Sequence, residues 1–261
     1  PSRMTAVHLY SLRERRGAQV TDGMADARYP VFDKSGRYLY FAASINSGPG
    51  MQNDVLSANA NETFRVFLTV LSTWDVSPLA TGGDKQSTLS GDGTMTVDTD
   101  GIQQRIVPLP LPARRYRGLL AGRPGVVFAL ESPATASETP RTRAMAVHRL
   151  DLEARMPAVA LESARDFTLS ADGGRALYFA GGQWTIEELG GAKSKTALKT
   201  ADIEVRSNPR LEWRQIYREV WRIYRDFFYD QRLHGLDLTA MERHYEPYLD
   251  RLASREDLNS L

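Results

Sequence analysis

The chain has 261 residues, of which 42% are apolar and 25% charged, a composition typical of a folded globular protein with room for two domains. Its 33 Lys and Arg and 32 Asp and Glu leave a net charge of +1, so no field of one sign would attract nucleic acid. The absence of Cys excludes disulfides and thiol nucleophiles, and is compatible with the cytosol or an exported location. No apolar run approaches the roughly 20 residues of a membrane span.

The two ends of the sequence suggest a segment of a longer polypeptide. Residue 1 is Pro, and no charged-then-apolar leader precedes the first alternating apolar residues. Ser254 and Asp257 have the spacing of a capping box, which predicts a helix that begins shortly before Leu261. We therefore expect further chain outside these residues.

A β-hairpin pattern recurs along the first part of the chain. Residues 31–43 hold two apolar runs around a tight turn at 33–36, and residues 167–179 repeat the pattern with a turn at 172–173. Residues 119–131 form a weaker copy, with the turn between Gly122 and Gly125. Gly125 and Gly173 are 48 residues apart, close to the ~40–50 residues of a four-stranded propeller blade.

Further strands are predicted after each hairpin, at residues 64–71, 144–152, 157–161 and 183–189. A strand pair is also expected within 91–110, around a turn at 98–101. The fold class is therefore mainly β, with about three four-stranded blades of a partial β-propeller over residues 1–205. Residues 45–63, 81–93 and 132–142 are polar and predict long surface loops, and contact of these loops with a ligand at a propeller mouth is the alternative.

The periodicity changes from two to between three and four after residue 206. Asn208 can cap a helix and Pro209 suits its first position. The sequence predicts a helix over 209–228 that buries one apolar stripe, which consists of Trp213, Ile216, Tyr217, Val220, Trp221, Tyr224, Phe227 and Phe228. A second helix is predicted from about Thr239, disturbed by Pro247 and ending within 248–253. Residues 206–261 are thus expected to form a separate α-helical segment.

The four histidines predict no catalytic centre. None lies in a cluster with carboxylates or near a Ser in a Gly-x-Ser-x-Gly elbow. His8 and His148 fall in predicted strands, where a structural role is expected, and His244 falls in the second helix. His234 and Asp230 could share a metal ion, but the third and fourth ligands of such a site are missing.

Phosphate and calcium motifs are also absent. The sequence contains neither G-x-x-x-x-G-K-[ST] nor a G-x-G-x-x-G that opens a helix, and residues 89–93 are glycine-rich without either context. Asp98 and Asp100 lack the Glu that closes an EF-hand and are predicted to form a hairpin turn. We expect no catalytic, cofactor-binding or metal-binding residue in this chain, and no cofactor.

Residues 212–230, 233–237, 245–248 and 253–259 resemble the start of the catalytic core in tricorn-type proteases. The hairpins at 33–41 and 170–179 are similar to the TolB-like (WD40-like) repeats of the propeller that precedes this core. The resemblance implies a serine peptidase of the S41 class, in which two propellers precede a mixed α/β core. Its nucleophilic Ser and a carboxylate belong to the second core part, and its base His follows shortly after the Asp-Leu-Asn motif, beyond Leu261.

The resemblance therefore implies that this segment alone is inactive and that the propeller guides peptide substrates to the core. It further implies that the partners are the remaining blades and core domains of the same polypeptide, that the protein is a cytoplasmic homo-oligomer, and that neither nucleic acid nor a membrane span is involved. Two alternatives remain: a non-enzymatic TolB- or WD-type binding propeller with an accessory helix, and a prolyl-oligopeptidase-type enzyme. The second is disfavoured because no Gly-x-Ser-x-Gly elbow follows the propeller.

Overall fold

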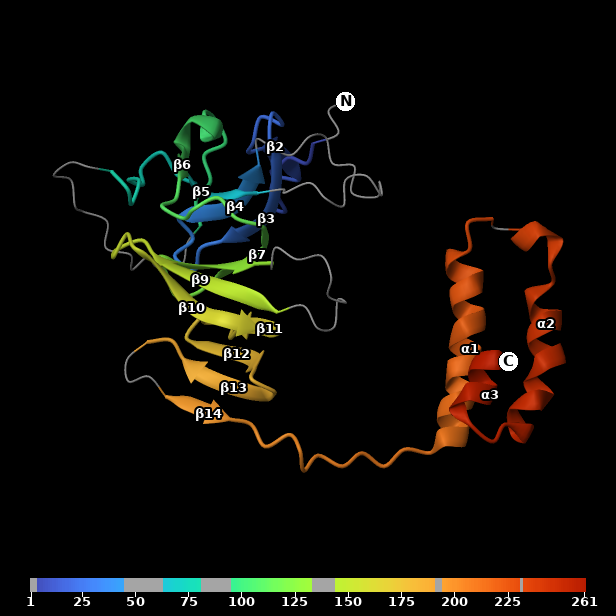
Figure 1. Ribbon diagram of the computed structural model, residues 1–261. Helices are drawn as coiled ribbons and strands as arrows, with labels where there is room; N and C mark the ends of the chain where they lie inside the picture. The colour runs from blue at the N-terminus through green and yellow to red at the C-terminus, as the bar shows by residue number, and fades with distance from the viewer. Residues whose placement is uncertain (1–3, 45–62, 81–94, 133–143, 191–193, 231) are drawn as a thin grey trace. The chain divides into compact units, whose positions relative to one another are not determined.

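The structure is a computed structural model that describes residues 4–44, 63–80, 95–132, 144–190, 194–230 and 232–261 (Figure 1). The chain divides into two compact units, Pro1–Thr200 and Ala201–Leu261, which are described separately. The predicted surface loops at 45–63, 81–93 and 132–142 lie almost entirely outside the described residues. The assignment of 1–205 to propeller blades and of 206–261 to a catalytic core stays a prediction.

The first unit consists of antiparallel sheets in which strands that are consecutive in the chain pair with one another. A two-stranded sheet of β1 (His8–Ser11) and β2 (Arg16–Gln19) comes first. The three four-stranded sheets that follow are called blades 1, 2 and 3. Blade 1 contains β3 (Asp26–Phe32), β4 (Tyr38–Ser44), β5 (Arg65–Val70) and β6 (Ile106–Pro108). Blade 2 contains β7 (Tyr116–Ala121), β8 (Val126–Glu131), β9 (Met145–Asp151) and β10 (Pro157–Ala164). Blade 3 contains β11 (Asp166–Leu169), β12 (Arg175–Ala180), β13 (Gln183–Glu188) and β14 (Lys195–Ala197).

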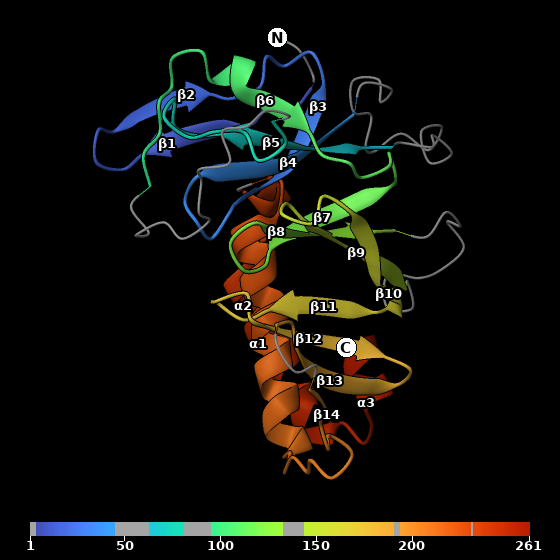
Figure 2. The same ribbon diagram turned by 90° about the vertical axis from the view of Figure 1, so that its left-hand side faces the viewer.

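The mainly β fold with three four-stranded sheets confirms the predicted fold class, and Figure 2 shows these sheets following one another from blade 1 to blade 3. The three predicted hairpins are β3–β4, β7–β8 and β11–β12. Their turns contain Gly36, Gly125 and Gly173 at φ 73°, 78° and 68°, a left-handed conformation that costs glycine little. The turn glycines are therefore the reason why the repeat was visible in the sequence.

Apolar side chains fill the spaces between neighbouring sheets. Tyr40 and Leu68 of blade 1 pack with Val127 and Leu150 of blade 2 in one buried cluster. On the other side of blade 2, Phe128 packs against Phe167 of blade 3, with ring centroids 5.5 Å apart. Because successive side chains of a strand point to opposite faces of its sheet, both faces of blade 2 carry an apolar layer. Stacked blades require such layers.

The strand pair expected within 91–110 is wrong for the part of it that the structure describes. Residues 95–99 form no strand, and a short 3-10 helix, η2 (Ile102–Arg105), leads into β6, which pairs with β5. Arg105 explains why the chain forms the helical turn η2 here, because its guanidinium donates to the backbone carbonyls of Val70 (3.0 Å), Asp100 (2.8 Å) and Asp98. Of the hairpin turn predicted at 98–101, residues 100–101 form a turn, but it leads into η2 and does not join two strands.

The second unit is helical. It contains α1 (Pro209–Phe227), η3 (Leu233–Gly235), α2 (Leu238–Tyr245), η4 (Glu246–Arg251) and α3 (Arg255–Ser260). The side chain of Asn208 accepts a hydrogen bond from the Leu211 N–H, and Pro209 opens α1, as predicted. Ser254 and Asp257 form the predicted capping box of α3. Among the helices of the described residues, none has the length and apolar character to span a bilayer.

The apolar stripe of α1 is buried over only half of its length. Tyr217 is buried with Leu249 and Leu258, and Trp213, Ile216 and Trp221 pack around them. Farther along the helix, Tyr224 is 50% exposed and Phe227 is 80% exposed. The expectation that α1 buries its whole stripe is therefore wrong within this unit, because the apolar cluster from η4 and α3 meets only the first half of the stripe.

Candidate functional site

His148 has the structural role that was predicted for it. It lies on β9 beside β8, is 6% exposed, and its Nε2 is 2.6 Å from Oε2 of Glu131. Glu131 also receives a hydrogen bond from Nη1 of Arg114 (3.1 Å), and the Tyr116 ring lies edge-on to the imidazole. Burial raises the pKa of Tyr116 to about 12. The imidazole of His148 is thus buried and held by Glu131 of the neighbouring strand.

The other histidines do not form a catalytic pair. His8 lies on β1, but its side chain is exposed while its neighbour Val7 is buried, so the structural role expected for His8 is not seen. His244 is exposed on α2, edge-on to Tyr245. Among the described residues, no hydrogen bond joins either histidine to a serine that it could activate.

Asp230 and His234 do come together after α1, as the sequence suggested. Nδ1 of His234 is 3.2 Å from Oδ2 of Asp230, and Nε2 of His234 is hydrogen-bonded to the Tyr229 hydroxyl. The backbone N–H groups of Arg232 and His234 lower the pKa of Asp230. Across the residues described, no group of three or more His, Cys, Asp or Glu side chains could hold a metal ion. The contacts of Asp230 and His234 form a hydrogen-bonded turn.

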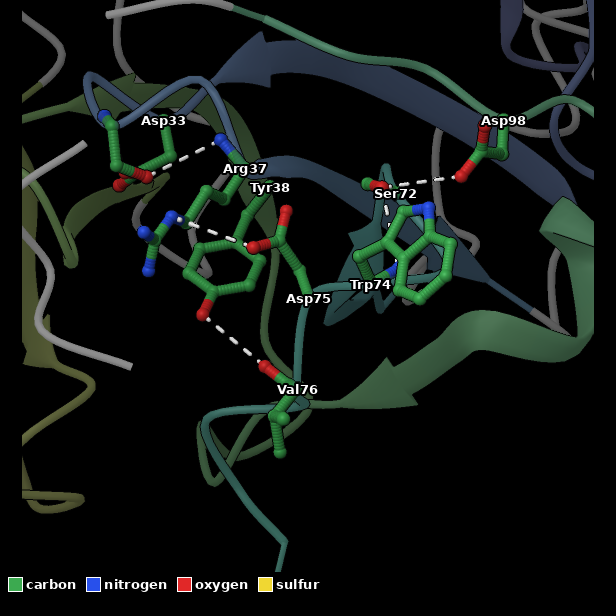
Figure 3. Close-up of polar contacts among 9 residues, drawn as sticks. Asp33, Arg37, Tyr38, Ser72, Trp74, Asp75, Val76 and Asp98 are labelled. Carbon is green, nitrogen blue, oxygen red and sulfur yellow. Dashed lines mark hydrogen bonds and ion pairs between the residues drawn. The ribbon is translucent and has the colours of Figure 1, made fainter. Parts of the chain in front are cut away.

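Asp98 organises the turn that follows β5 (Figure 3). Its Oδ2 accepts hydrogen bonds from Ser72 Oγ (3.1 Å), from Thr73 N (2.7 Å) and from Thr73 Oγ1 (2.8 Å). The Thr73 contacts hold the pKa of Asp98 below its usual value. The sequence placed Asp98 in a turn but could not identify these partners, which lie about 25 residues away in the chain.

Trp74 is the most exposed large side chain of this turn, at 91%. The backbone N–H of Trp74 donates to Ser72 Oγ (3.3 Å), and Asp75 beside it pairs with Nε of Arg37 at 3.5 Å. The Tyr38 hydroxyl donates to the carbonyl of Val76 (3.3 Å), so the turn is held on both sides of Trp74 (Figure 3). Composition and periodicity did not single out this tryptophan, because it lies in no apolar pattern.

A polar, open cavity of about 360 Å³ lies between the hairpin turns of blades 2 and 3. Its lining pairs guanidinium groups with carboxylates, and Nη2 of Arg175 is 3.3 Å from Oε1 of Glu188. Ser170 and Asp172 hydrogen-bond to one another, and Ser170 together with the Gly174 N–H lowers the pKa of Asp172. The lining residues are Arg123, Ser170, Asp172, Gly174, Arg175 and Glu188. The serine of this set donates to the Asp172 carboxylate, whose lowered pKa makes it a weak base, and no histidine lines the cavity.

Comparison with known proteins shows what the chain is similar to. Residues 209–261 match the family model described as the Tricorn protease C1 domain. The chain is 26% identical over 269 aligned residues to a protein of Streptomyces coelicolor named "Putative tricorn protease homolog 2", with 93% of this chain and 22% of that protein covered. It is 29% identical to "Tricorn protease homolog 1" of the same organism, with 89% and 24% covered.

The fold of the chain is similar to that of a tricorn protease. The structure described as "Crystal structure of the tricorn protease" has a TM-score of 0.77 with this chain at 18% identity, covering 98% of this chain and 25% of that one. The tricorn-type fold thus includes the β unit as well as the helices. The chain spans about a quarter of the length of the tricorn relatives that it matches. That none of its own residues is catalytic stays a prediction.

Proposed function

We propose that this chain is a segment of a tricorn-like serine peptidase of the S41 class that degrades peptides, and that its catalytic residues lie outside residues 1–261. The observation that carries the proposal is the match of residues 209–261 to the Tricorn protease C1 domain. It is supported by relatives that are named tricorn proteases.

Under this proposal the two units have different tasks. Residues 1–205 are the last blades of a propeller that guides peptides, and residues 206–261 are the helical start of the core domain. The half-exposed stripe of α1 supports the second assignment, because Tyr224 and Phe227 offer apolar surface for the rest of a core to cover. Further blades and core parts of the same polypeptide are then the natural partners.

Assembly and location belong to the same proposal. A cytoplasmic homo-oligomer is what the tricorn resemblance implies. The apolar side chains that stay exposed on the helical unit, among them Ile223 (53%) and Phe227 (80%), are compatible with burial in an assembly.

Peptide hydrolysis by two proteins tests the proposal: the 261-residue chain and a full-length protein that contains it. We expect the full-length protein to cleave unstructured peptides and the chain alone to leave them intact. Hydrolysis by the chain alone, lost when one of its own side chains is replaced, would contradict the placement of the site. A full-length protein that binds peptides but never cleaves them would instead favour a non-enzymatic binding propeller.

A further inference from the structure

Trp74 stands apart from the other tryptophans of the chain. Trp184, Trp213 and Trp221 are partly buried by their own units, whereas Trp74 is 91% exposed at the turn after β5. An indole is among the largest apolar surfaces that a side chain can offer, and tryptophan is enriched at the centres of binding interfaces. Packing within blade 1 does not explain its presence at this position.

The turn beneath Trp74 is held in place from several directions. Asp98 accepts three hydrogen bonds from Ser72 and Thr73, and the Asp98 N–H in turn donates to the carbonyl of Leu71 (2.9 Å). The Leu71 N–H donates to the carbonyl of Arg37 (2.9 Å), which ties the turn to the first hairpin. Binding of a partner at Trp74 therefore costs little conformational entropy, because the backbone that carries the indole is already ordered.

The surroundings of Trp74 favour a polypeptide as its partner. Of the charges on this turn, Arg37 and Asp75 are paired with one another and Asp98 is negative, whereas nucleic acid binding relies on cations that meet phosphates. Val76 (38% exposed) and Met95 (46% exposed), which packs beside Gly36, add apolar surface near the same two turns. A small apolar surface interrupted by a neutral ion pair suits an unfolded peptide, which presents side chains and backbone groups in alternation.

We propose that Trp74 is a contact residue for unfolded peptides on blade 1. The inference rests on the proposed peptidase function and deepens it, since it names a residue at which the propeller would meet the substrate. Because the indole provides most of the apolar surface there, the contact should depend on its size and hardly at all on its charge surroundings.

Fluorescence anisotropy of dye-labelled short unstructured peptides from a casein digest, titrated with the 261-residue chain or its variants, tests the inference. Trp74 dominates quenching by acrylamide because it is the most exposed indole, so bound peptide should shield it from acrylamide. We expect Trp74→Ala to weaken peptide binding about tenfold, as truncation of an interface anchor does, and Trp74→Phe to weaken it less. Leu12→Ala is the control, since Leu12 is 86% exposed at the β1–β2 turn and should leave binding unchanged.

Unchanged peptide affinity in Trp74→Ala would overturn the inference, as would self-association of the chain through Trp74 in place of peptide binding. The same substitution in the full-length protein separates this inference from the proposed function. If that protein cleaves peptides and Trp74→Ala leaves KM unchanged, the contact is wrong and the peptidase proposal stands. If no cleavage occurs but peptides still protect Trp74, the contact stands and the peptidase proposal is wrong.

Discussion

The carboxylate of Asp33 joins blade 1 to blade 2, and its removal should destabilise the β unit. Asp33 is 3% exposed and accepts hydrogen bonds from the Tyr40 hydroxyl (2.7 Å), the Gly125 N–H (2.9 Å) and the Ser35 N–H (2.8 Å). Burial, and then the Asp33 carboxylate, raise the pKa of Tyr40 well above its usual value, so its hydroxyl stays a donor. Each buried donor that loses its acceptor costs about 1–3 kcal/mol, so Asp33→Ala should cost about 3 kcal/mol or more.

Urea unfolding of the 261-residue chain measures this cost, and amide exchange at Gly125 locates it. Tyr40→Phe removes one of the three donors and should cost only about 1 kcal/mol. Asp172→Ala is the matched control, because Asp172 occupies the corresponding turn of blade 3 but is exposed, and its loss should cost less than about 1 kcal/mol. Equal effects of Asp33→Ala and Asp172→Ala, or unchanged exchange at Gly125, would refute the role of this carboxylate between the blades.

Three further predictions concern single positions in the two units. Gly173→Ala should destabilise the β unit by about 2–5 kcal/mol, because Gly173 has φ +68° and a Cβ would lie 2.2 Å from the carbonyl carbon of Gly122. Gly182→Ala is the control and should cost only about 1 kcal/mol, since Gly182 has φ +81° but open space around it. Similar urea midpoints for the two variants would contradict the close approach of Gly173 to Gly122. Ser254→Ala should lower the stability of the helical unit by about 0.5–2 kcal/mol, measured by circular dichroism, and no loss would argue against the capping box. Backbone N–H groups of the cap lower the pKa of Asp257. The contribution of this carboxylate to the stability of the helical unit is therefore present above the ordinary carboxyl pKa and is lost as pH falls through the lowered value. Asp257→Asn should flatten this acid dependence of helix unfolding, and an unchanged pH profile would refute the prediction.

The hairpins could be predicted because local chemistry determines them. Gly36, Gly125 and Gly173 occupy turns with positive φ, and the flanking apolar runs form the paired strands. The start of α1 was predictable for the same reason, since Asn208 and Pro209 are local signals. The region 91–110 was not, because its path depends on hydrogen bonds from Arg105 to the end of β5, and an alternating pattern carries no information about them.

Contacts between side chains that are distant in the sequence could likewise be predicted only in part. His148 could be placed in a strand, but Glu131, its partner, lies 17 residues away and is brought to it by the register of β8 and β9. The apolar stripe predicted the helix α1 correctly, but only half of the stripe is buried. Periodicity identifies an apolar face and does not identify the elements that cover it. Trp74 carried no sequence signal, because its interest comes from exposure on a turn that Asp98 holds.

Labelling with a serine-directed fluorophosphonate, followed by peptide mapping, tests the central claim most directly. We expect the full-length protein to be labelled at a serine outside the 261 residues, with loss of peptide hydrolysis, and the 261-residue chain alone to remain unlabelled. Labelling of a serine within the chain, for example Ser170 in the polar cavity, would contradict the claim that the reactive centre lies elsewhere. So would a full-length protein that hydrolyses peptides at an undiminished rate in the presence of the reagent.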